Sequence, residues 1–229
     1  MPLLSVIVPV YNEAKTIRQI LEKINSIGID KEIIVIDNYS TDGTRLILQD
    51  ILKKRELDAI KVIYHSYNKG KGTSVREGIN QASAEFIVIQ DADLEYDPND
   101  YFDLIKPLLE KKADIALGAR FMGGHSGILL HRLGNKFLTG FLNLMFASHL
   151  NDYATCYKMA DKDTFLNLGL KSTSFDIEVE IICKVLKNHL RIVEVPISYY
   201  PRSYAEGKKI RWLDGLQAIM SILKYRFSS

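Results

Sequence analysis

The sequence has 229 residues, 47% hydrophobic and 25% charged, a composition that excludes disorder and fits one large α/β domain better than two small ones. The 30 Lys and Arg residues nearly balance the 28 Asp and Glu residues, so the net charge of +2 gives no reason to expect nucleic-acid binding. The two cysteines, Cys156 and Cys183, form no redox motif, which argues against a disulfide framework and favours a reducing, cytoplasmic compartment.

Apolar runs that predict strands alternate with amphipathic segments that predict helices over the first half of the chain. Residues 4–10 are β-branched and lack the basic and long apolar regions of a targeting peptide, so they predict a strand. Further buried strands are expected at 32–37, 61–64, 86–90 and 114–118. Helices are expected at 12–28, after the turn 40–43, from Thr73 or Ser74, and at 98–111. This alternation predicts an α/β fold with a mostly parallel, Rossmann-like sheet flanked by helices.

The second half of the chain is less regular. Helices are expected at 128–149 and 175–188, a strand at 191–199, and a basic, amphipathic helix at 211–227. This last helix either lies in a membrane interface or packs on the domain, and the sequence leaves both open. Because no apolar stretch reaches the length of about 18 residues that a membrane span needs, we expect no transmembrane helix.

Acidic residues follow the predicted strand at 86–90. In open α/β sheets ligands bind at the carboxyl ends of strands, so Asp91, Asp93 and Glu95 are placed to meet a ligand. Carboxylates with substrate phosphates are the usual ligands of Mg²⁺ and Mn²⁺, which makes this a candidate metal site. The same spacing recurs at Asp161 and Asp163, but we expect no such strand before them, so position favours the first pair.

Asp37 ends the second predicted strand. Its carboxylate is placed to accept hydrogen bonds from a nucleobase or a ribose hydroxyl, or alternatively to cap a helix that begins near Thr41. We favour ligand binding, because Glu13, Asp37 and Asp91 follow three strands and are expected to meet in one crevice.

Two basic segments are candidates for phosphate binding. The glycine-rich loop 68–72 brings Lys71 and Gly72 to a helix N-terminus that favours anions, although a plain turn explains it equally well. The segment 202–209 gathers Arg202, Lys208 and Lys209 around a glycine, which suits a mobile phosphate clamp as well as a solvated charge run.

Four ordered motifs resemble those of the family 2 inverting glycosyltransferases of the GT-A fold: residues 8–13, 36–44, 91–98 and 118–121. Within this family the chain is most similar to the dolichyl- and polyprenyl-phosphate mannose and glucose synthases, whose C-terminal pattern residues 193–197, Arg202 and 207–209 follow. The resemblance implies transfer of a hexose from a UDP- or GDP-sugar to a polyprenyl phosphate, with Mg²⁺ or Mn²⁺ as cofactor. It also implies a peripheral place on the cytoplasmic membrane face.

The resemblance further assigns roles within one domain, 1–229, of which 1–120 bind the nucleotide sugar and 121–229 the acceptor. The implied donor-binding residues are Pro9, Tyr11, Glu13, Asp37, Lys71, Gly72, Asp91 and Ala92, and the implied metal ligands are Asp91, Asp93 and Glu95. The residues implied to meet the acceptor phosphate are Arg120, Arg132, Arg202, Lys208 and Lys209.

The chain departs from the family pattern in two places. The usual pair of acids after the second strand is Asp37 and Asn38 here, which leaves the base preference open. The clamp reads Glu-Gly-Lys-Lys at 206–209 where mannose synthases tend to have Gly-x-Ser-Lys, which leaves the sugar open.

The acceptor decides which residues are catalytic. A lipid phosphate is largely dianionic at neutral pH, since its second pKa is about 6, and needs no base. A saccharide hydroxyl needs one, for which Asp152 is the first candidate and Asp176 and Glu178 follow. We therefore expect Asp93, Arg120 and Asp152 in the catalytic set, and we favour the phosphate acceptor.

Three alternatives remain beside that function. The chain either adds a sugar to a growing polysaccharide or glycolipid, or is a sugar-nucleotide nucleotidyltransferase, or binds nucleotide sugars without catalysis. The apolar face of the helix at 211–227 is equally suited to lipid and to a homo-oligomer contact.

Overall fold

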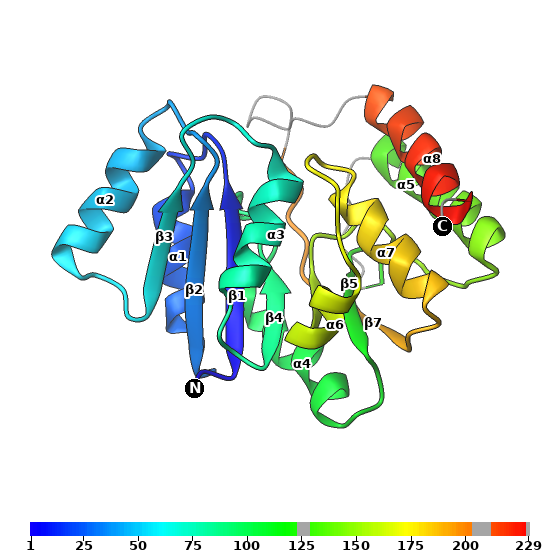
Figure 1. Cartoon of the computed structure of the whole chain (residues 1–229), viewed down its shortest axis with the longest axis horizontal. Coiled ribbons are helices and arrows are strands. Elements are labelled where there is room, and N and C mark those ends of the chain that lie inside the picture. Colours follow the sequence, from blue (N-terminus) through cyan, green and yellow to red (C-terminus); the bar gives the residue numbers. More distant parts are fainter. Residues whose placement is uncertain (123–128, 203–211, 228–229) are drawn as a thin grey trace.

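The computed structural model describes residues 1–122, 129–202 and 212–227, with side chains omitted at 129–131 and 212–214. It confirms an α/β fold whose seven-stranded sheet has the order β3-β2-β1-β4-β6-β5-β7 (Figure 1). The strands are β1 (Leu4–Val10), β2 (Lys31–Asp37), β3 (Ile60–Tyr64), β4 (Phe86–Ile89), β5 (Ile115–Ala119), β6 (Lys158–Asp161) and β7 (Ile192–Pro196). All pairings are parallel except those of β6 with β4 and β5.

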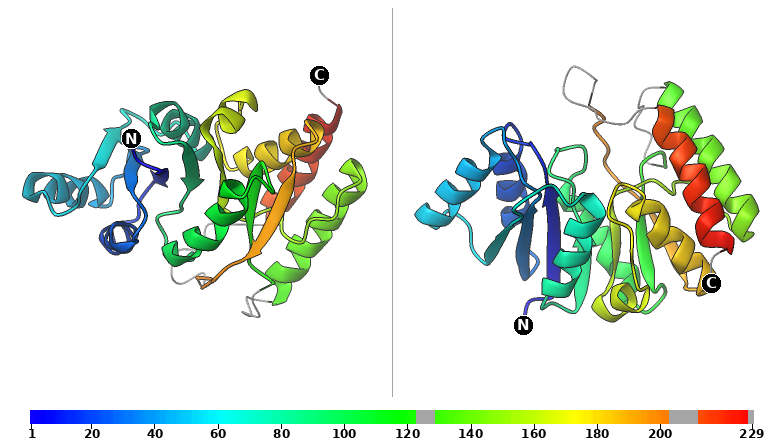
Figure 2. Two further views of the ribbon diagram at one scale, coloured as in Figure 1. Left: turned by 90° about the horizontal axis from the view of Figure 1, so that it is seen from below. Right: turned by 45° about the horizontal axis from the view of Figure 1, so that its top comes forward.

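Helices cover both faces of this sheet. They are α1 (Ile17–Ser26), α2 (Thr44–Lys54), α3 (Lys71–Gln81), a 3₁₀ turn (Pro98–Asp100), α4 (Tyr101–Leu109), α5 (Leu129–Phe146), α6 (Lys162–Asn167), α7 (Ile177–Lys187) and α8 (Trp212–Phe227). Helices α3, α6 and α7 lie on one face and α1 and α4 on the other, while α5 and α8 pack together beside the β5–β7 end (Figures 1 and 2). Among the described helices, none has both the length and the apolar character needed to span a bilayer.

The central strands are apolar because both of their faces are covered. In β1, Val6, Ile7 and Val8 are fully buried. Helix α3 comes so close to this strand that a Cβ added at Gly78 would lie 2.3 Å from a methyl carbon of Ile7. A glycine at this position therefore lets α3 lie flat on β1, with its N-terminal end at the carboxyl ends of the strands.

The predicted alternation is confirmed in the first half of the chain, whereas the second half contains a strand that we did not predict. We expected no apolar strand like β4 before Asp161, and a four-residue strand that includes Lys158, β6, ends there. This strand runs antiparallel, with Asp161 opposite Phe86 at the start of β4, so Asp161 lies at the sheet edge away from the ends of β1 and β4. Its carboxylate accepts a hydrogen bond from the Thr164 amide at 2.7 Å and caps α6.

Candidate functional site

Acidic side chains gather where β1, β2 and β4 end. These three strands are neighbours in the sheet and parallel, so Glu13, Asp37 and Asp91 follow strand ends at the same edge, as the sequence predicts. This edge lies at the top of the sheet in Figure 1. Ala92 and Asp93, the two residues that follow Asp91, extend along the same edge, and Ala92 is buried.

Arg202 reaches into this acidic edge from the segment that follows β7. Its Nη1 donates to Glu13 Oε2 at 3.0 Å and its Nη2 to Asp93 Oδ2 at 2.8 Å. The Nε lies 3.8 Å from Glu95 Oε1. One guanidinium from the second half of the chain therefore bridges carboxylates that follow β1 and β4 in the first half.

Glu95 holds residues 199–202 in place through its carboxylate and its backbone carbonyl. Its Oε1 accepts a hydrogen bond from the Arg202 amide at 2.9 Å, and its Oε2 accepts one from the Tyr199 hydroxyl at 3.1 Å. The Tyr200 amide donates to the Glu95 carbonyl at 2.8 Å. Residues 199–202 thus lie along the acidic segment after β4, and the Glu95 carboxylate holds them there.

The charge balance of this edge favours a cation. Burial and the neighbouring carboxylates of Asp91 and Glu95 raise the pKa of Asp93 to about 7, although Arg202 opposes the shift. Burial also acts to raise the pKa of Asp91, but the adjacent Lys71 ammonium outweighs it and lowers that pKa. Within the described residues no three acidic, His or Cys side chains already form a metal cage. Because Mg²⁺ and Mn²⁺ complete their shell with substrate phosphates, Asp93 and Glu95 fit as a partial, hard-oxygen ligand set.

Lys71 stands at the first turn of α3 and pairs with two carboxylates. Its Nζ lies 2.7 Å from Asp91 Oδ1 and 3.0 Å from Glu178 Oε1. Lys158, fully buried on β6, contacts the other oxygen of Glu178 and the Thr155 carbonyl. Glu178, one of our candidates for a base, is therefore held between two ammonium groups. Lys158 could not be singled out from the sequence, since a lone lysine in a four-residue strand gives no sign of its burial.

The loop before α3 needs its glycines. Gly70 has φ +84°, and a Cβ there would lie 2.1 Å from the Thr173 carbonyl oxygen. At Gly72 a Cβ would lie 2.5 Å from the Ser172 carbonyl oxygen. The loop is therefore shaped by close contact with residues 172–173, and its amides open the N-terminus of an 11-residue helix.

Asn38 organises the same loop from the end of β2. Its Oδ1 accepts from the Lys69 amide at 2.7 Å, and its Nδ2 donates to Asn68 Oδ1 at 2.8 Å. Asn68 Oδ1 also accepts from the Gly70 amide at 2.9 Å, which fixes the orientation of both side-chain amides. The asparagine at the position where the family usually has an acid thus acts on the glycine-rich loop.

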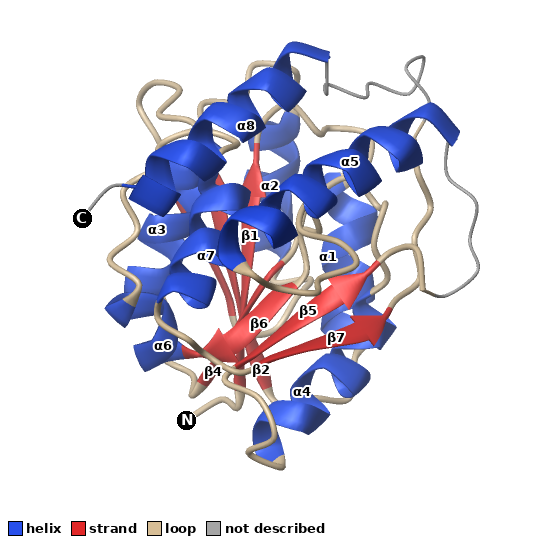
Figure 3. Ribbon diagram, turned by 90° about the vertical axis from the view of Figure 1, so that its right-hand side faces the viewer, coloured by secondary structure: helices blue, strands red, loops and turns tan. Residues whose placement is uncertain are grey.

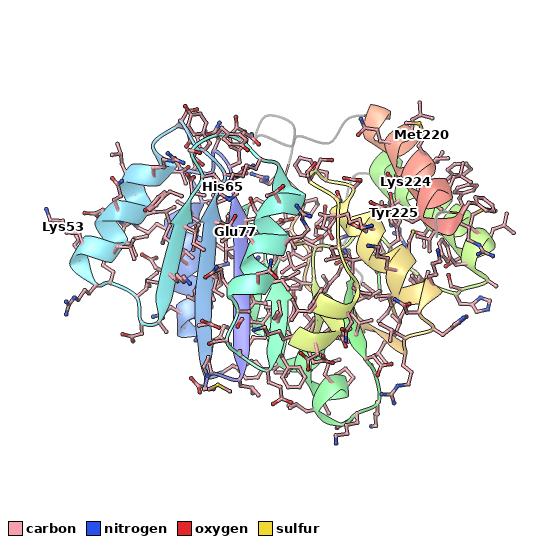
Figure 4. The ribbon with its side chains drawn as sticks, in the orientation of Figure 1. Lys53, His65, Glu77, Met220, Lys224 and Tyr225 are labelled. Atoms are coloured by element: carbon pink, nitrogen blue, oxygen red, sulfur yellow. The ribbon has the colours of Figure 1, made fainter. Side chains whose placement is uncertain are left out.

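His65 supports Asn38 from β3. Its Nδ1 lies 3.0 Å from Asn38 Oδ1 and its Nε2 lies 2.8 Å from Glu77 Oε2, and His65 itself is buried (Figure 4). The Lys69 amide fixes Asn38 Oδ1 as an acceptor, so both ring nitrogens face acceptor atoms. The imidazole ring therefore links the end of β2 to Glu77 on α3.

Asp37 is fully buried and already has partners. Its Oδ1 accepts a hydrogen bond from the Ser40 amide at 3.2 Å, and its Oδ2 accepts one from Arg45 Nε. The guanidinium of Arg45 also stacks 5.2 Å from the Tyr39 ring. Asp37 does not cap α2, because that helix begins at Thr44, whose amide donates to Asp42 Oδ1 at 3.0 Å. Arg45 went unnoticed in the sequence, since nothing there links it to Asp37.

Asp152 is not placed to act as a base. It is fully buried, and its Oδ2 accepts from Arg120 Nε at 2.7 Å while its Oδ1 accepts from Arg120 Nη2 at 2.7 Å. The Arg120 amide and Asn135 Nδ2 donate to the same two oxygens at 3.2 and 3.1 Å. A carboxylate that accepts four hydrogen bonds from fixed donors offers no free position for a substrate proton in this arrangement, so the role of Asp152 as a general base stays a prediction that the geometry does not favour.

The remaining predicted residues lie around this core. Arg120 stacks 5.2 Å from the Tyr199 ring and 5.3 Å from that of Phe121, and Arg132 lies 5.8 Å from Phe121 on its exposed side. Pro9 is half-buried in β1 and Tyr11 is exposed just after it. Lys208 and Lys209 fall outside the described residues.

Comparisons with known proteins agree on the type of protein. The profile of the family described as glycosyl transferase family 2 matches residues 5–169. Glycosyltransferase AglJ of Haloferax volcanii is 30% identical over 200 residues, which cover 86% of this chain and 63% of the relative. Dolichol-phosphate mannosyltransferase of Pyrococcus furiosus is 28% identical over 211 residues, which cover 89% of this chain and 58% of the relative. The chain thus spans about three fifths of the length of these relatives.

Among solved structures the fold is similar to that of glucosyl-3-phosphoglycerate synthase from Mycobacterium tuberculosis. The complex of that enzyme with Mn²⁺, uridine diphosphate and phosphoglyceric acid superposes with a TM-score of 0.75, covering 100% of this chain and 80% of the other. The two sequences are 18% identical, so this likeness concerns the fold alone.

Proposed function

Since the chain belongs to glycosyl transferase family 2, we propose that it moves a hexose from a UDP- or GDP-sugar to a polyprenyl phosphate. The observation that carries the choice of acceptor is the state of Asp152, whose carboxylate is fully engaged by Arg120 and Asn135. A saccharide hydroxyl requires a base, whereas a lipid phosphate arrives as its own nucleophile. The relative from Pyrococcus furiosus, named for dolichol phosphate, supports the same class of acceptor.

The donor is proposed to lie across the carboxyl ends of β1, β2 and β4. The loop before α3 offers backbone amides to a diphosphate at a helix N-terminus. Asp93 and Glu95 would hold a divalent cation, which when bound neutralises charge on the leaving nucleoside diphosphate. Mn²⁺ and uridine diphosphate in the M. tuberculosis neighbour support this assignment of donor and metal.

The reaction itself asks the protein to orient two anions and stabilise charge. A phosphate oxygen of the acceptor attacks the anomeric carbon, and the bond from that carbon to the nucleoside diphosphate breaks. Lys71, oriented by Asp91 and Glu178, is placed to neutralise charge on the departing diphosphate. Arg120, oriented by Asp152, is proposed to hold the attacking phosphate together with Arg132 and Arg202.

A lipid acceptor requires the protein to reach a membrane, and α5 with α8 offers a suitable surface. The two helices lie side by side on one outer face of the molecule (Figure 3). Each has an exposed apolar stripe at helical spacing, and exposed basic residues flank the stripes. The stripe residues are Leu133, Phe137 and Leu144 on α5 and Leu216, Met220, Leu223 and Phe227 on α8, and the basic residues are Lys136, Lys224 and Arg226. Figure 4 shows Met220 and Lys224 on this outer helix.

We propose that this face rests peripherally on the cytoplasmic face of an anionic membrane. The double substitution Phe137→Ser and Met220→Ser should reduce co-sedimentation with vesicles that contain an anionic phospholipid. Leu46→Ser is the matched control, since Leu46 is 69% exposed on α2 at the far end of the sheet. Unchanged vesicle binding with loss of a dimer in solution would instead assign the face to a homo-oligomer.

The test of the proposed reaction is nucleoside diphosphate release from a panel of UDP- and GDP-sugars. Each donor is supplied with Mn²⁺ or Mg²⁺, with and without a short polyprenyl phosphate. Release that needs one donor, the metal and the lipid phosphate supports the proposal and names the sugar. Donor binding without stimulation by the lipid phosphate would instead favour a saccharide acceptor.

A further inference from the structure

The guanidinium of Arg202 lies against Asp93 and Glu95, the two carboxylates that the proposed function gives to a metal, and against Glu13 beside them. It donates to Glu13 and Asp93 at 3.0 and 2.8 Å and lies 3.8 Å from Glu95. Three carboxylates and one guanidinium leave a formal charge of −2 at this point, counting all three acids as ionised. A single monovalent side chain thus stands where a divalent cation in its place would reduce the formal charge to −1.

The fit of Arg202 among these carboxylates is incomplete. Its Nε is buried and has no hydrogen-bond partner in the described structure, because the nearest carboxylate oxygen is too far away. A buried donor without a partner costs free energy relative to a solvated one. When it leaves this position, the side chain gives up its two hydrogen bonds to Glu13 and Asp93 but frees its Nε to find a partner.

The backbone of Arg202 is anchored independently of its side chain. Its amide donates to Glu95 Oε1 at 2.9 Å, the Tyr200 amide donates to the Glu95 carbonyl at 2.8 Å, and the Ser198 amide donates to Asp100 Oδ2 at 2.8 Å. A carboxylate has about four lone-pair positions, so Glu95 can keep this contact and still ligate a cation. The guanidinium can thus swing away while the chain stays in place.

We propose that Arg202 and the divalent cation compete for the carboxylates of Asp93 and Glu95, so that loading the cation frees the guanidinium for the acceptor phosphate. This inference rests on the metal and acceptor assignments of the proposed function. It makes Arg202 a residue that couples binding of the cation to binding of the acceptor phosphate. Before the cation binds, the guanidinium contacts Glu13 and Asp93, and after the cation binds it can contact the acceptor phosphate.

The coupling must act in both directions, because linkage between two binding events is reciprocal. A phosphate that draws Arg202 toward itself removes the competitor of the cation and should raise the cation affinity. An Arg202 that merely ties two loops together, with no exchange, would show no such coupling.

The test measures Mn²⁺ affinity of the full chain by electron paramagnetic resonance of free Mn²⁺, with no nucleotide present. Arg202→Gln should bind Mn²⁺ about 5-fold or more tightly than the wild type, at the lower end of typical coupling between linked sites. Arg132→Gln removes an equal charge near the site without touching the three carboxylates in the described structure, and its affinity should change less than 2-fold by long-range screening alone. Arg202→Lys, which keeps the charge but loses the planar, forked guanidinium, should lie between.

A second arm adds inorganic phosphate to the same titration. Phosphate should tighten Mn²⁺ binding in the wild type and lose that effect in Arg202→Gln, whereas direct phosphate–Mn²⁺ contact would persist in the variant. Equal Mn²⁺ affinities of Arg202→Gln, Arg202→Lys and Arg132→Gln would overturn the competition. Absence of Mn²⁺ binding in every protein, even with a nucleoside diphosphate present, would instead remove the proposed metal site from which the inference starts.

Discussion

At the acidic edge around Asp93, the two halves of the molecule supply opposite charges. The first half, residues 1–120, balances part of its own acidity, since Arg45 pairs with Asp37 and Lys71 with Asp91. Asp93 is left without a cation from that half, and Arg202 of the second half reaches it. The acidic edge and the basic segment are therefore complementary, and neither half contains a complete site.

The largest expected effect follows from breaking the acidic side. Asp93→Ala should lower nucleoside diphosphate release about 10²- to 10³-fold, the range typical of losing one electrostatic stabiliser of the leaving group. The fold should remain intact, because Asp93 is a buried acid among like charges whose removal relieves repulsion. Circular dichroism and a melting curve check this.

Asp161→Ala is the matched control for that change. Asp161 has the same spacing to a second acid but caps α6 at the opposite edge of the sheet. Its loss should cost about 1 kcal/mol of unfolding free energy and leave turnover unchanged. Loss of turnover in Asp161→Ala but not in Asp93→Ala would show that the active site lies at the Asp161 edge of the sheet and would contradict the site proposed at Asp93.

At the proposed acceptor-phosphate site, Asp152→Asn tests whether Arg120 needs Asp152 to hold its guanidinium in position. Removing one charge of a buried pair leaves the guanidinium uncompensated, so the unfolding free energy should fall by about 3 kcal/mol in urea denaturation. Activity that survives should show a raised KM for the acceptor and an unchanged KM for the donor. A variant of native stability whose kcat falls at every pH, with the acceptor KM unchanged, would restore Asp152 as a base.

A smaller effect is expected where the donor loop meets β2. Asn38→Asp replaces the Nδ2 donor with an oxygen that faces Asn68 Oδ1, so the loop loses one hydrogen bond and gains a repulsive contact. The unfolding free energy should fall by about 1 kcal/mol and the donor KM should rise several-fold. Donor titration by calorimetry measures this, and an unchanged affinity would show that the loop does not contact the donor.

The smallest effect concerns Asp100, which holds the segment after β7. Burial, opposed by the hydrogen bond from the Ser198 amide, raises the pKa of Asp100 to about 6. A raised pKa means that the carboxyl favours the folded state below its unfolded pKa of about 4 and loses that contribution as pH rises through 6. Asp100→Asn should therefore be more stable than the wild type at pH 8, by on the order of 1 kcal/mol after solvent screening. Melting curves at pH 8 and pH 5 should show the difference shrinking toward the lower pH, whereas a constant difference would contradict the prediction.

The elements of the first half were predictable because local pattern and burial agree there. Strand β1 is a continuous apolar run buried on both faces, and Asp91 and Asp93 directly follow such a run in β4. Parallel topology then brings these acids to one edge without further information. That part of the candidate site could be read from sequence order alone.

The second half resisted prediction because its contacts are set by the fold. Strand β6 has four residues, including Lys158, and no pattern distinguishes it from a turn. Lys158 pairs with Glu178, and Asp152 pairs with Arg120. Both pairs depend on the burial of Lys158 and Asp152, which the sequence does not show. Sequence gave Asp152 a chemical role because it is acidic, but the structure surrounds it with hydrogen-bond donors.

Strand β6 also has a consequence for the way the chain is made. It lies between β4 and β5, which follow each other in the sequence but are not paired in the sheet. During synthesis, the backbone groups of β4 and β5 that pair with β6 therefore stay without that partner until residues 158–161 have left the ribosome. Such long-range pairing slows folding and leaves nascent chains prone to aggregation. A chain halted after β5 has no partner for either edge, so this sheet forms as a unit only once most of the polypeptide is available.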